Sequence, residues 1–317
     1  MLKFILKRLL HAIPLIIIVT IISFAIITLA PGDPVYMFVN PEQATPQDLE
    51  MIRAELGLNE SIPVRYFRWV SKAVQLDFGK SFLTSRPVMD MLKEALPNTL
   101  ILALAATLFS FAIAIPAGII SAVKRNTFLD YLFSTISFIG ISLPAFWFGL
   151  MLILVFSLKL NWLPTAGMRE NFDAFVFSDR LRHIILPMLV LGMAQMAGKM
   201  RQLRSAMLEV IRQDYIRTAR SKGLKETVVI MKHAFRNALL PIITLLGFII
   251  PGLVSGAVIT ETIFSWPGIG RIAVQASFNR DYPVIMGNLM IASVMVIIGS
   301  MIADILYAVA DPRIKYD

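Results

Sequence analysis

Side chains able to do chemistry are few in this sequence, and they are far apart. The three histidines, His11, His183 and His233, have no second ligand at the spacing of a metal site. The chain has no cysteine, which excludes disulfides, thiolate metal sites and cysteine nucleophiles. Gly79-Lys80-Ser81 matches the end of a phosphate-binding loop, but Val74 stands where that loop needs glycine. We therefore expect no enzyme and no nucleotide site in this chain.

The strongest signal is a basic segment that runs from Lys199 to Arg236. Ten of its residues are Lys or Arg and three are acidic, so it carries +7 of the chain's net charge of +9. Lys and Arg resist transfer across a membrane, so a segment this basic between apolar stretches is expected in the cytoplasm. A basic chain can also bind nucleic acid, but no interleaved aromatic platform accompanies this charge, and we expect no nucleic-acid partner.

Two helices are expected inside the basic segment. Met207, Ile211 and Tyr215 recur every four residues, and a second helical stripe follows after position 223. The second stripe consists of Leu224, Val228, Met231 and Phe235. Gly223 lies between the stripes, where a residue in the left-handed conformation would end the first helix. The segment is therefore predicted to be a helix, a sharp turn and a second helix facing the cytosol, on which a partner protein acts.

The elements that position this segment are membrane-spanning helices. With 57% hydrophobic and 16% charged residues and a mean hydropathy of +0.72, the chain has the composition of an all-α polytopic membrane protein. Cutting the sequence at its charges leaves six long uncharged stretches, most of them longer than the roughly 20 residues that a spanning helix needs. These stretches are 9–32, 95–123, 131–158, 183–198, 237–260 and 282–303.

The charge distribution supports six spans with both termini inside. In that arrangement the inside segments hold 17 basic and 7 acidic residues, and the outside segments hold 13 basic and 14 acidic residues. This is the asymmetry that the positive-inside rule predicts. The fourth stretch has only 16 residues, but deleting it would place the basic segment outside, so we retain it as a span.

The chain is expected to divide into three parts. Residues 1–96 form a first spanning helix and a long extracytoplasmic loop, residues 97–310 form a five-helix core with the cytoplasmic segment 199–236, and residues 311–317 form a cytoplasmic tail. In the loop, Thr45 and Pro46 predict a helix start and Gly57 a stop. A second helix is expected from Ile62 to Ala73. The loop either receives a substrate-delivering partner or covers helix ends.

Interruptions are expected within the core. Pro116, Gly140, Pro144 and Gly149 permit kinks in the second and third spans. The stripe of Val88, Met91, Leu92, Ala95 and Leu96 predicts a helix along the membrane interface before Pro97 opens the second span. The spans as cut contain no charged side chain, and a proton-coupled pump would usually need one, so the energy for any transport is expected to come from another chain.

Three stretches of the sequence are more specific for one protein family than the overall composition is. They are Asp214-Tyr215-Ile216-Arg217-Thr218-Ala219-Arg220-Ser221-Lys222-Gly223, Arg236-Asn237-Ala238-Leu239-Leu240-Pro241 and Glu261-Thr262-Ile263-Phe264-Ser265-Trp266-Pro267-Gly268-Ile269-Gly270. With Arg8-Leu9-Leu10, Pro31-Gly32-Asp33-Pro34 and the closing Asp311-Pro312-Arg313, they resemble the B-type membrane permease subunits of dipeptide, oligopeptide and nickel binding-protein-dependent ABC importers. The resemblance covers nearly the whole chain.

The first stretch is similar to the family's cytoplasmic coupling motif, which begins Glu-Ala-Ala and has glycine six residues after the Glu. Here Arg217 occupies the Glu position, Thr218 and Ala219 follow, and Gly223 is the glycine. The missing Glu departs from the general pattern and resembles the peptide-transporter variant. In this interpretation, small Ala219 lets the helix sit in a groove on an ATPase, and Gly223 fixes the turn that aims it.

The resemblance implies a type I ABC importer permease fold and a heteromeric complex in the plasma (inner) membrane of a bacterium or archaeon. The implied partners are a second related permease that forms a heterodimer with this chain, two cytosolic ATPase subunits, an extracytoplasmic substrate-binding protein and membrane lipid. This chain would hold no cofactor, since ATP and Mg would bind to the ATPase subunits. Closure of the ATPases would rock the two permeases between outward and inward openings.

Two groups of site residues follow from the resemblance. The ATPase-coupling residues are Asp214, Tyr215, Arg217, Thr218, Ala219, Lys222 and Gly223. The residues for an outer gate or for docking of the binding protein are Glu261, Trp266, Pro267, Gly268 and Gly270, although a tight turn that only caps two helices explains them as well. The cargo is expected to be a di- or oligopeptide, with nickel or another small solute as the alternative. A secondary transporter and a membrane scaffold are the other classes considered.

Overall fold

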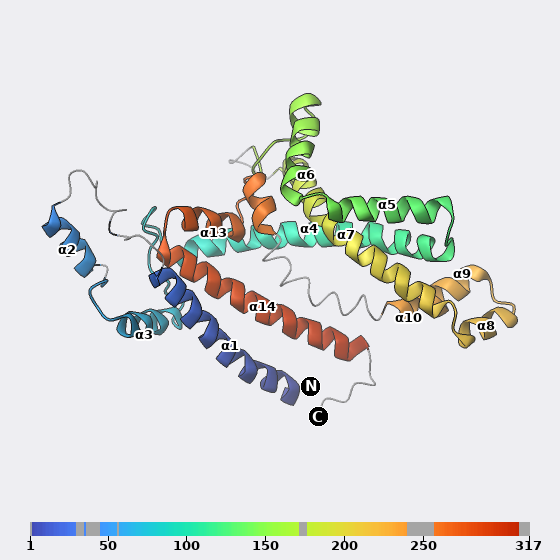
Figure 1. The fold of residues 1–317 in the computed structure, drawn as a ribbon, viewed down its shortest axis with the longest axis horizontal. Coiled ribbons are helices and arrows are strands. Elements are labelled where there is room, and N and C mark those ends of the chain that lie inside the picture. Colours follow the sequence, from blue (N-terminus) through green and yellow to red (C-terminus); the bar gives the residue numbers. More distant parts are fainter. Residues whose placement is uncertain are drawn as a thin grey trace. The chain divides into compact units, whose positions relative to one another are not determined.

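The structure, a computed structural model, describes residues 2–29, 35, 45–55, 57–170, 176–239 and 257–310. The described residues form helices and loops, with one isolated β-bridge between Lys80 and Pro87 (Figure 1). The chain divides into two compact units. The first unit comprises Met1–Asn98 and Pro267–Ile297, and the second comprises Thr99–Trp266 and Ile298–Asp317.

Four helices are long and apolar enough to cross a membrane. They are Leu10–Leu29 in α1 (Leu2–Leu29), α4 (Val88–Val123), α7 (Phe177–Val210) and Tyr282–Ile302 in α14 (Tyr282–Ala310). A bent helix pair is a fifth candidate. The expected span 237–260 falls largely on positions 240–256, which lie outside the described residues. The expected exit of the first span at 30–34 lies outside them too.

The expected third span is bent at a proline. α5 (Phe128–Ser142) ends just before Leu143 and Pro144, and α6 (Ala145–Leu152) begins after them at an angle of 103°. Proline disfavours helical conformation in the residue before it, and Leu143 is extended, with ψ of 126°. α6 continues into a π-helical segment, η2 (Ile153–Lys159). Of the interruptions expected in the stretch 131–158, Pro144 is therefore the one at the bend.

In the first unit, two short helices follow the sequence predictions. α2 (Pro46–Glu55) is capped reciprocally: the Thr45 hydroxyl accepts the Asp48 N–H at 3.2 Å, and the Asp48 carboxylate accepts the Thr45 N–H at 3.0 Å. α3 (Ile62–Ala73) packs on α1, where Thr20 and Tyr66 hydroxyls lie 3.0 Å apart. The edge-to-face contact of Phe24 with Tyr66, at 5.5 Å between ring centres, extends this packing.

The helix expected along the interface before Pro97 does not exist as a separate element. α4 begins at Val88 and runs through Pro97 without a break, so the stripe forms the first turns of the same helix. Its buried members Val88, Leu92 and Ala95 pack in a cluster with Ile269, Ala276 and Val284. Two of these belong to α13 (Ile269–Phe278), a helix that the sequence analysis missed.

The Gly79-Lys80-Ser81 sequence has a structural explanation. The buried carboxylate of Asp281 accepts hydrogen bonds from the Ser81 hydroxyl at 2.5 Å and from the Phe82 N–H at 3.0 Å. The Ser81 oxygen in turn accepts the N–H of Thr84 at 3.0 Å. Gly79 has φ of +80°, the left-handed region that favours glycine. The Gly79-Lys80-Ser81 sequence thus forms a turn that is hydrogen-bonded to Asp281, the residue before α14, and not a phosphate-binding loop.

Replacing Asp281 by alanine is expected to release this turn. Hydrogen bonds to a charged group stabilise a protein by about 1.5–3 kcal/mol, so the local opening of residues 80–86 should become at least about ten-fold more frequent. Trypsin cleavage after Lys80 in the detergent-solubilised protein measures this opening, because Ser81 follows Lys80 whereas Pro87 protects the bond after Arg86. Asp77→Ala is the matched control because Asp77 is exposed and accepts one N–H, that of Gly79, at 2.9 Å. Equal cleavage of the two variants would contradict the role given to Asp281.

In the second unit, α7 is about twice as long as its uncharged part. It runs from Phe177 to Val210, so Lys199 and Arg204 lie inside a continuous helix that extends beyond the expected span 183–198 at both ends. Lys199 is 7% exposed, and its ammonium donates to Ser110 at 2.9 Å and to Gln195 at 2.8 Å. It also lies 4.5 Å from the Phe111 ring centre. These neutral partners let the helix continue through a buried cation.

Candidate functional site

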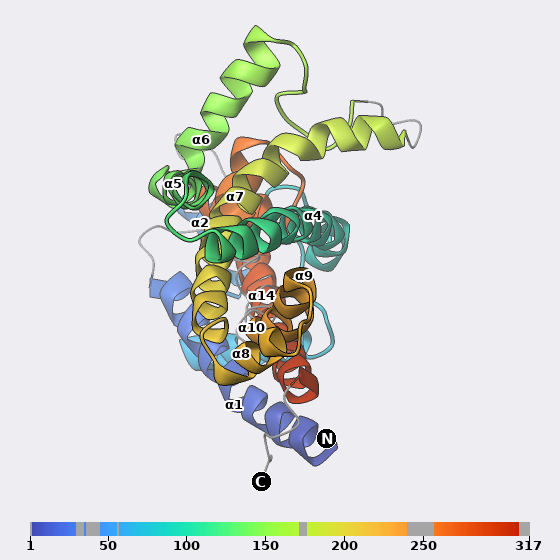
Figure 2. The same cartoon turned by 90° about the vertical axis from the view of Figure 1, so that its right-hand side faces the viewer.

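The expected coupling residues lie on a short helix at the C-terminal end of α7. α8 (Asp214–Ser221) follows a break at residues 211–213, and α9 (Glu226–Val228), the π-helical η3 (Val229–Phe235) and α10 (Arg236–Ala238) come next. In both views these short helices gather beside the end of α7 (Figure 1, Figure 2). The first expected helix is therefore two helices, because the chain turns between Ile211 and Asp214.

The inner face of α8 packs against its own chain. Ile216 is fully buried and Ala219 is 5% exposed. Their cluster includes Leu203 and Met207 of α7 and Ala122 at the end of α4. Val229, Ile230, Ala234 and Ala238 complete it from η3 and α10. The small side chain of Ala219 thus lets α8 approach its own chain, so the groove in which it lies is formed by this protein.

The turn after α8 has the geometry that the sequence predicts. Gly223 has φ of +73°, and its N–H bonds the carbonyl of Arg220 at 2.9 Å. A Cβ added at Gly223 would meet no atom within 4 Å, so the left-handed backbone alone favours glycine there. The expectation that Gly223 ends the helix is confirmed.

An ion pair closes the same turn. The Arg220 guanidinium donates to both carboxylate oxygens of Glu226, at 2.7 and 3.1 Å. This hydrogen bonding holds the pKa of Glu226 below its usual range and raises that of Arg220. Because both side chains are largely exposed, the pair contributes little to global stability. It fixes the direction in which the chain leaves α8.

The outer face of the coupling segment is exposed and mixes charge with apolar side chains. Asp214 and Arg217 face solvent 3.7 Å apart, and the Thr218 hydroxyl bonds the Asp214 carbonyl at 3.0 Å. Tyr215 is 45% exposed and its hydroxyl accepts a hydrogen bond from Asn237 at 3.2 Å. Ser221, Lys222, Leu224, Val228 and Met231 are exposed around them. The stripe of Leu224, Val228 and Met231 thus faces outward, while Val229, Ile230 and Ala234 are buried.

The second expected group is largely internal. In the second unit, Glu261 is fully buried and accepts a hydrogen bond from Thr99 at 2.6 Å. The side chain of Trp266 is buried and packs with Leu102, Ala106 and Leu191, and the backbone N–H of Trp266 donates to the backbone carbonyl of Glu261 at 2.8 Å. Neither side chain reaches the surface of the chain. Such burial suits the packing of a gate better than direct contact with a binding protein.

The remaining residues of this group begin α13 in the first unit. Gly268 precedes the helix in extended conformation, and both Gly268 and Gly270 are buried. Pro267 is exposed, and its carbonyl accepts a hydrogen bond from Asn98 at 2.9 Å. These contacts fit the alternative in which the stretch forms a turn that fixes helix ends.

Sequence reasoning missed an ionic network beside the coupling segment. Arg204 of α7 donates to both oxygens of Asp130, each at 2.8 Å, and Ser121 of α4 also donates to Asp130. The Asn126 N–H bonds the same carboxylate at 3.0 Å. α4, α5, their connecting turn and α7 are therefore joined at one carboxylate. The sequence alone predicts a loop position for Asp130, because the uncharged stretch of the third span begins at the next residue, Tyr131.

Comparison with known proteins follows the same outline. A family model described as "Binding-protein-dependent transport system inner membrane component" matches residues 114–316. A model described as "Binding-prot-dependent transport system membrane comp, N-term" matches residues 1–103. The resemblance drawn from the sequence motifs is confirmed by these matches and by the relatives below.

Two relatives match along the whole chain. "Oligopeptide transport system permease protein AppB" of Bacillus subtilis (strain 168) is 46% identical over 317 residues, covering 100% of both chains. "Di/tripeptide transport system permease protein DppB" of Pseudomonas aeruginosa (strain UCBPP-PA14) is 40% identical over 334 residues, covering 100% of this chain and 99% of that one.

A solved structure supports the fold. A chain of the inward-facing MetNI methionine ABC transporter superposes with a TM-score of 0.58 at 18% identity, covering 72% of this chain and 100% of that one. This likeness shows a shared helical fold. Together with the family matches it identifies a non-catalytic, multi-pass subunit of a bacterial inner membrane. The chain belongs to the family of inner-membrane components of binding-protein-dependent transport systems.

Proposed function

We propose that this permease imports di- or oligopeptides and is driven by ATP hydrolysis on partner subunits. The supporting observation is the likeness, over the full chain, to permeases whose names specify oligopeptide and di/tripeptide transport. Uptake of a labelled tripeptide by cells with and without the chain tests the cargo. Uptake of a nickel chelate but no peptide would instead assign the alternative cargo.

The proposed architecture has six spans of the type I importer fold and cytoplasmic termini. It keeps the division into residues 1–96, the core 97–310 with its segment 199–236, and the tail 311–317. A related second permease would form a heterodimer with this chain. Two cytosolic ATPases carrying ATP and Mg, and an extracytoplasmic binding protein, would complete the importer. The net charge of segment 199–236 supports this orientation.

The proposed role of α8 and the following turn is to receive the movement of an ATPase. The exposed residues Asp214, Tyr215, Arg217, Thr218 and Lys222 would contact the ATPase. Ala219 and Gly223 would set the position of that surface from beneath. Because Ile216 and Ala219 pack on Leu203 and Met207, a displacement of α8 would pass directly into α7.

For the second group we propose a gate role without direct docking. Glu261 and Trp266 would set the packing of an outer gate in the second unit. Pro267, Gly268 and Gly270 would start α13. The burial of Trp266 and Glu261 supports this version. Substituting Trp266 by leucine should then change uptake without changing the affinity of the binding protein, which a direct binding assay measures.

Gly223→Ala tests the coupling role. The left-handed backbone should cost the alanine variant about 1–2 kcal/mol, which lowers the ratio of the correctly turned state to other conformations roughly ten-fold, so binding-protein-stimulated uptake should fall. Uptake and ATP hydrolysis by the purified transporter in vesicles measure this effect. Both should fall together if the turn aims α8 at the ATPase.

Two glycines provide matched controls. Gly198→Ala adds a methyl group that also meets no atom within 4 Å, but within a helix, and should leave uptake unchanged. Gly79→Ala imposes a similar left-handed strain, φ of +80°, in the first unit far along the chain from the coupling segment. Normal uptake by Gly223→Ala, or an equal loss in all three variants, would refute the role of this turn.

A further inference from the structure

The first unit contains a cavity of about 490 Å³ apart from both groups of expected site residues. Aromatic rings and one methionine supply its apolar walls: Phe24, Trp69, Phe78, Phe82, Tyr282 and Met286. Two arginines, Arg53 and Arg65, also line it, and no Asp or Glu is among its described lining residues. Its volume is in the range of pockets that bind small ligands. The cavity therefore combines positive charge with an apolar surface.

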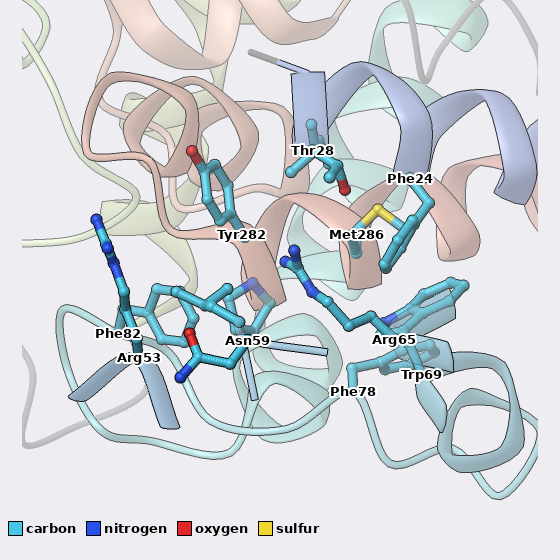
Figure 3. A pocket seen from close by; sticks show the side chains of 13 residues that line it. Phe24, Thr28, Arg53, Asn59, Arg65, Trp69, Phe78, Phe82, Tyr282 and Met286 are labelled. Atoms are coloured by element: carbon cyan, nitrogen blue, oxygen red, sulfur yellow. The ribbon is translucent and has the colours of Figure 1, made fainter. Parts of the chain in front are cut away.

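The guanidinium of Arg65 lies in this cavity. Figure 3 shows the Arg65 guanidinium within it, with Tyr282 on one side and Met286 on the other. Within the described part of the chain this guanidinium makes no hydrogen bond or ion pair, while Glu60, which acts on it through its charge, is hydrogen-bonded to Arg68. Burial lowers the pKa of Arg65. The site is suited to an anion.

The cavity lies where two candidate spans meet the membrane surface. Phe24 and Thr28 belong to the last turns of the span Leu10–Leu29, and Tyr282 and Met286 belong to the first turns of Tyr282–Ile302. α3, which supplies Arg65 and Trp69, is amphipathic, and its apolar residues Ile62, Val64 and Phe67 are exposed. A helix with this pattern beside a span end is typical of the bilayer interface. The cavity is thus at the depth of lipid headgroups.

We propose that this cavity binds the phosphate group of an anionic membrane lipid, held by Arg65, with the acyl chain against Phe24 and Met286. A free peptide fits less well, because its ammonium group would find no carboxylate among the described lining residues. An arginine near the membrane surface favours an anionic lipid over a neutral one roughly five-fold.

Quenching of Trp69 fluorescence tests this site in the intact transporter. The purified complex is reconstituted in phosphatidylcholine with increasing amounts of brominated phosphatidylglycerol or brominated phosphatidylcholine, whose bromine atoms quench nearby tryptophan. The signal of Trp69 is the difference between the wild type and Trp69→Phe. We expect half-maximal quenching at a roughly five-fold lower fraction of the anionic lipid. Equal quenching by the two lipids in the wild type would overturn the proposal.

Variants on α3 distinguish binding at this site from a nonspecific attraction of anionic lipid to the positive charge of the helix. Arg65→Gln should abolish the preference for phosphatidylglycerol, and Arg65→Lys should keep it because the charge remains. Lys72→Gln, which removes an exposed cation from α3, should also keep it. Loss of the preference in Lys72→Gln and Arg65→Gln alike would refute a specific site. Displacement of the quencher by a dipeptide without the binding protein would assign the cavity to the cargo instead.

Discussion

Replacing Gly192 by valine is expected to separate α4 from α7 and to destabilise the protein by about 3 kcal/mol. A Cβ at this position would lie 2.6 Å from Phe109 Cδ1 and 3.0 Å from the carbonyl oxygen of Ala106. The phenyl ring can turn away from the added group. The carbonyl belongs to the backbone of α4, so relief requires the two helices to move apart.

The thermal unfolding midpoint of the detergent-solubilised protein measures this effect. Gly198→Val is the matched control, because it places the same side chain in the same helix where an added Cβ meets no atom within 4 Å. A lower midpoint for Gly192→Val alone is the expected result. Similar midpoints for the two variants would show that the close approach of α4 and α7 is not required for stability.

Replacing Arg204 by methionine is expected to have a similarly large effect. The substitution leaves the Asp130 carboxylate, whose side chain is 4% exposed, without its cationic partner. Removing one member of a buried ion pair costs about 3 kcal/mol or more, because the remaining charge is uncompensated. Arg201→Met is the control, because it removes an exposed cation from the same helix. The Arg201 guanidinium lies 5.6 Å from the centre of the Phe138 ring. Its loss should lower the stability much less than the loss of Arg204.

The double variant gives a second criterion. When Asp130→Asn is added to Arg204→Met, no charge is left buried, so part of the lost stability should return. Unfolding of the four proteins in one detergent provides the double-mutant cycle. If the two losses simply add, the ion pair does not join these helices and the interpretation of the network is incorrect.

The short helices outside the spans were predictable because their signals are local. The Thr45–Asp48 cap, the stripe of α3 and the left-handed Gly223 depend on residues a few positions apart, and the structure has all three. α13 was not predicted, because Pro267 and Gly268 before it are signals of a turn. Local turn signals mark where a helix starts and say nothing of how far it continues.

The lengths of the helices were harder to predict from the sequence, because a charged side chain can be buried in a helix when residues far away in the sequence bind it. The helix α7 continues past Lys199, where the uncharged stretch ends, because Ser110 on α4 and Phe111 beside it accommodate that ammonium. The sequence also carried no sign that Asp130 pairs with Arg204, because the two residues are distant in sequence. The burial of Ala219 against its own chain also depended on packing that spacing alone does not specify.

Because α7 is continuous through its charged residues, it can transmit a movement along its length as one rigid element. From Pro187, where a helix can bend, to Val210 it extends about 35 Å at 1.5 Å per residue. A tilt of about 10° at the end beside α8 would move the other end by about 6 Å, close to one helical turn. A helix broken at Lys199 would absorb the same push as bending. A continuous helix instead carries a small rotation at Val210 along its whole length as a displacement of several ångströms at Pro187.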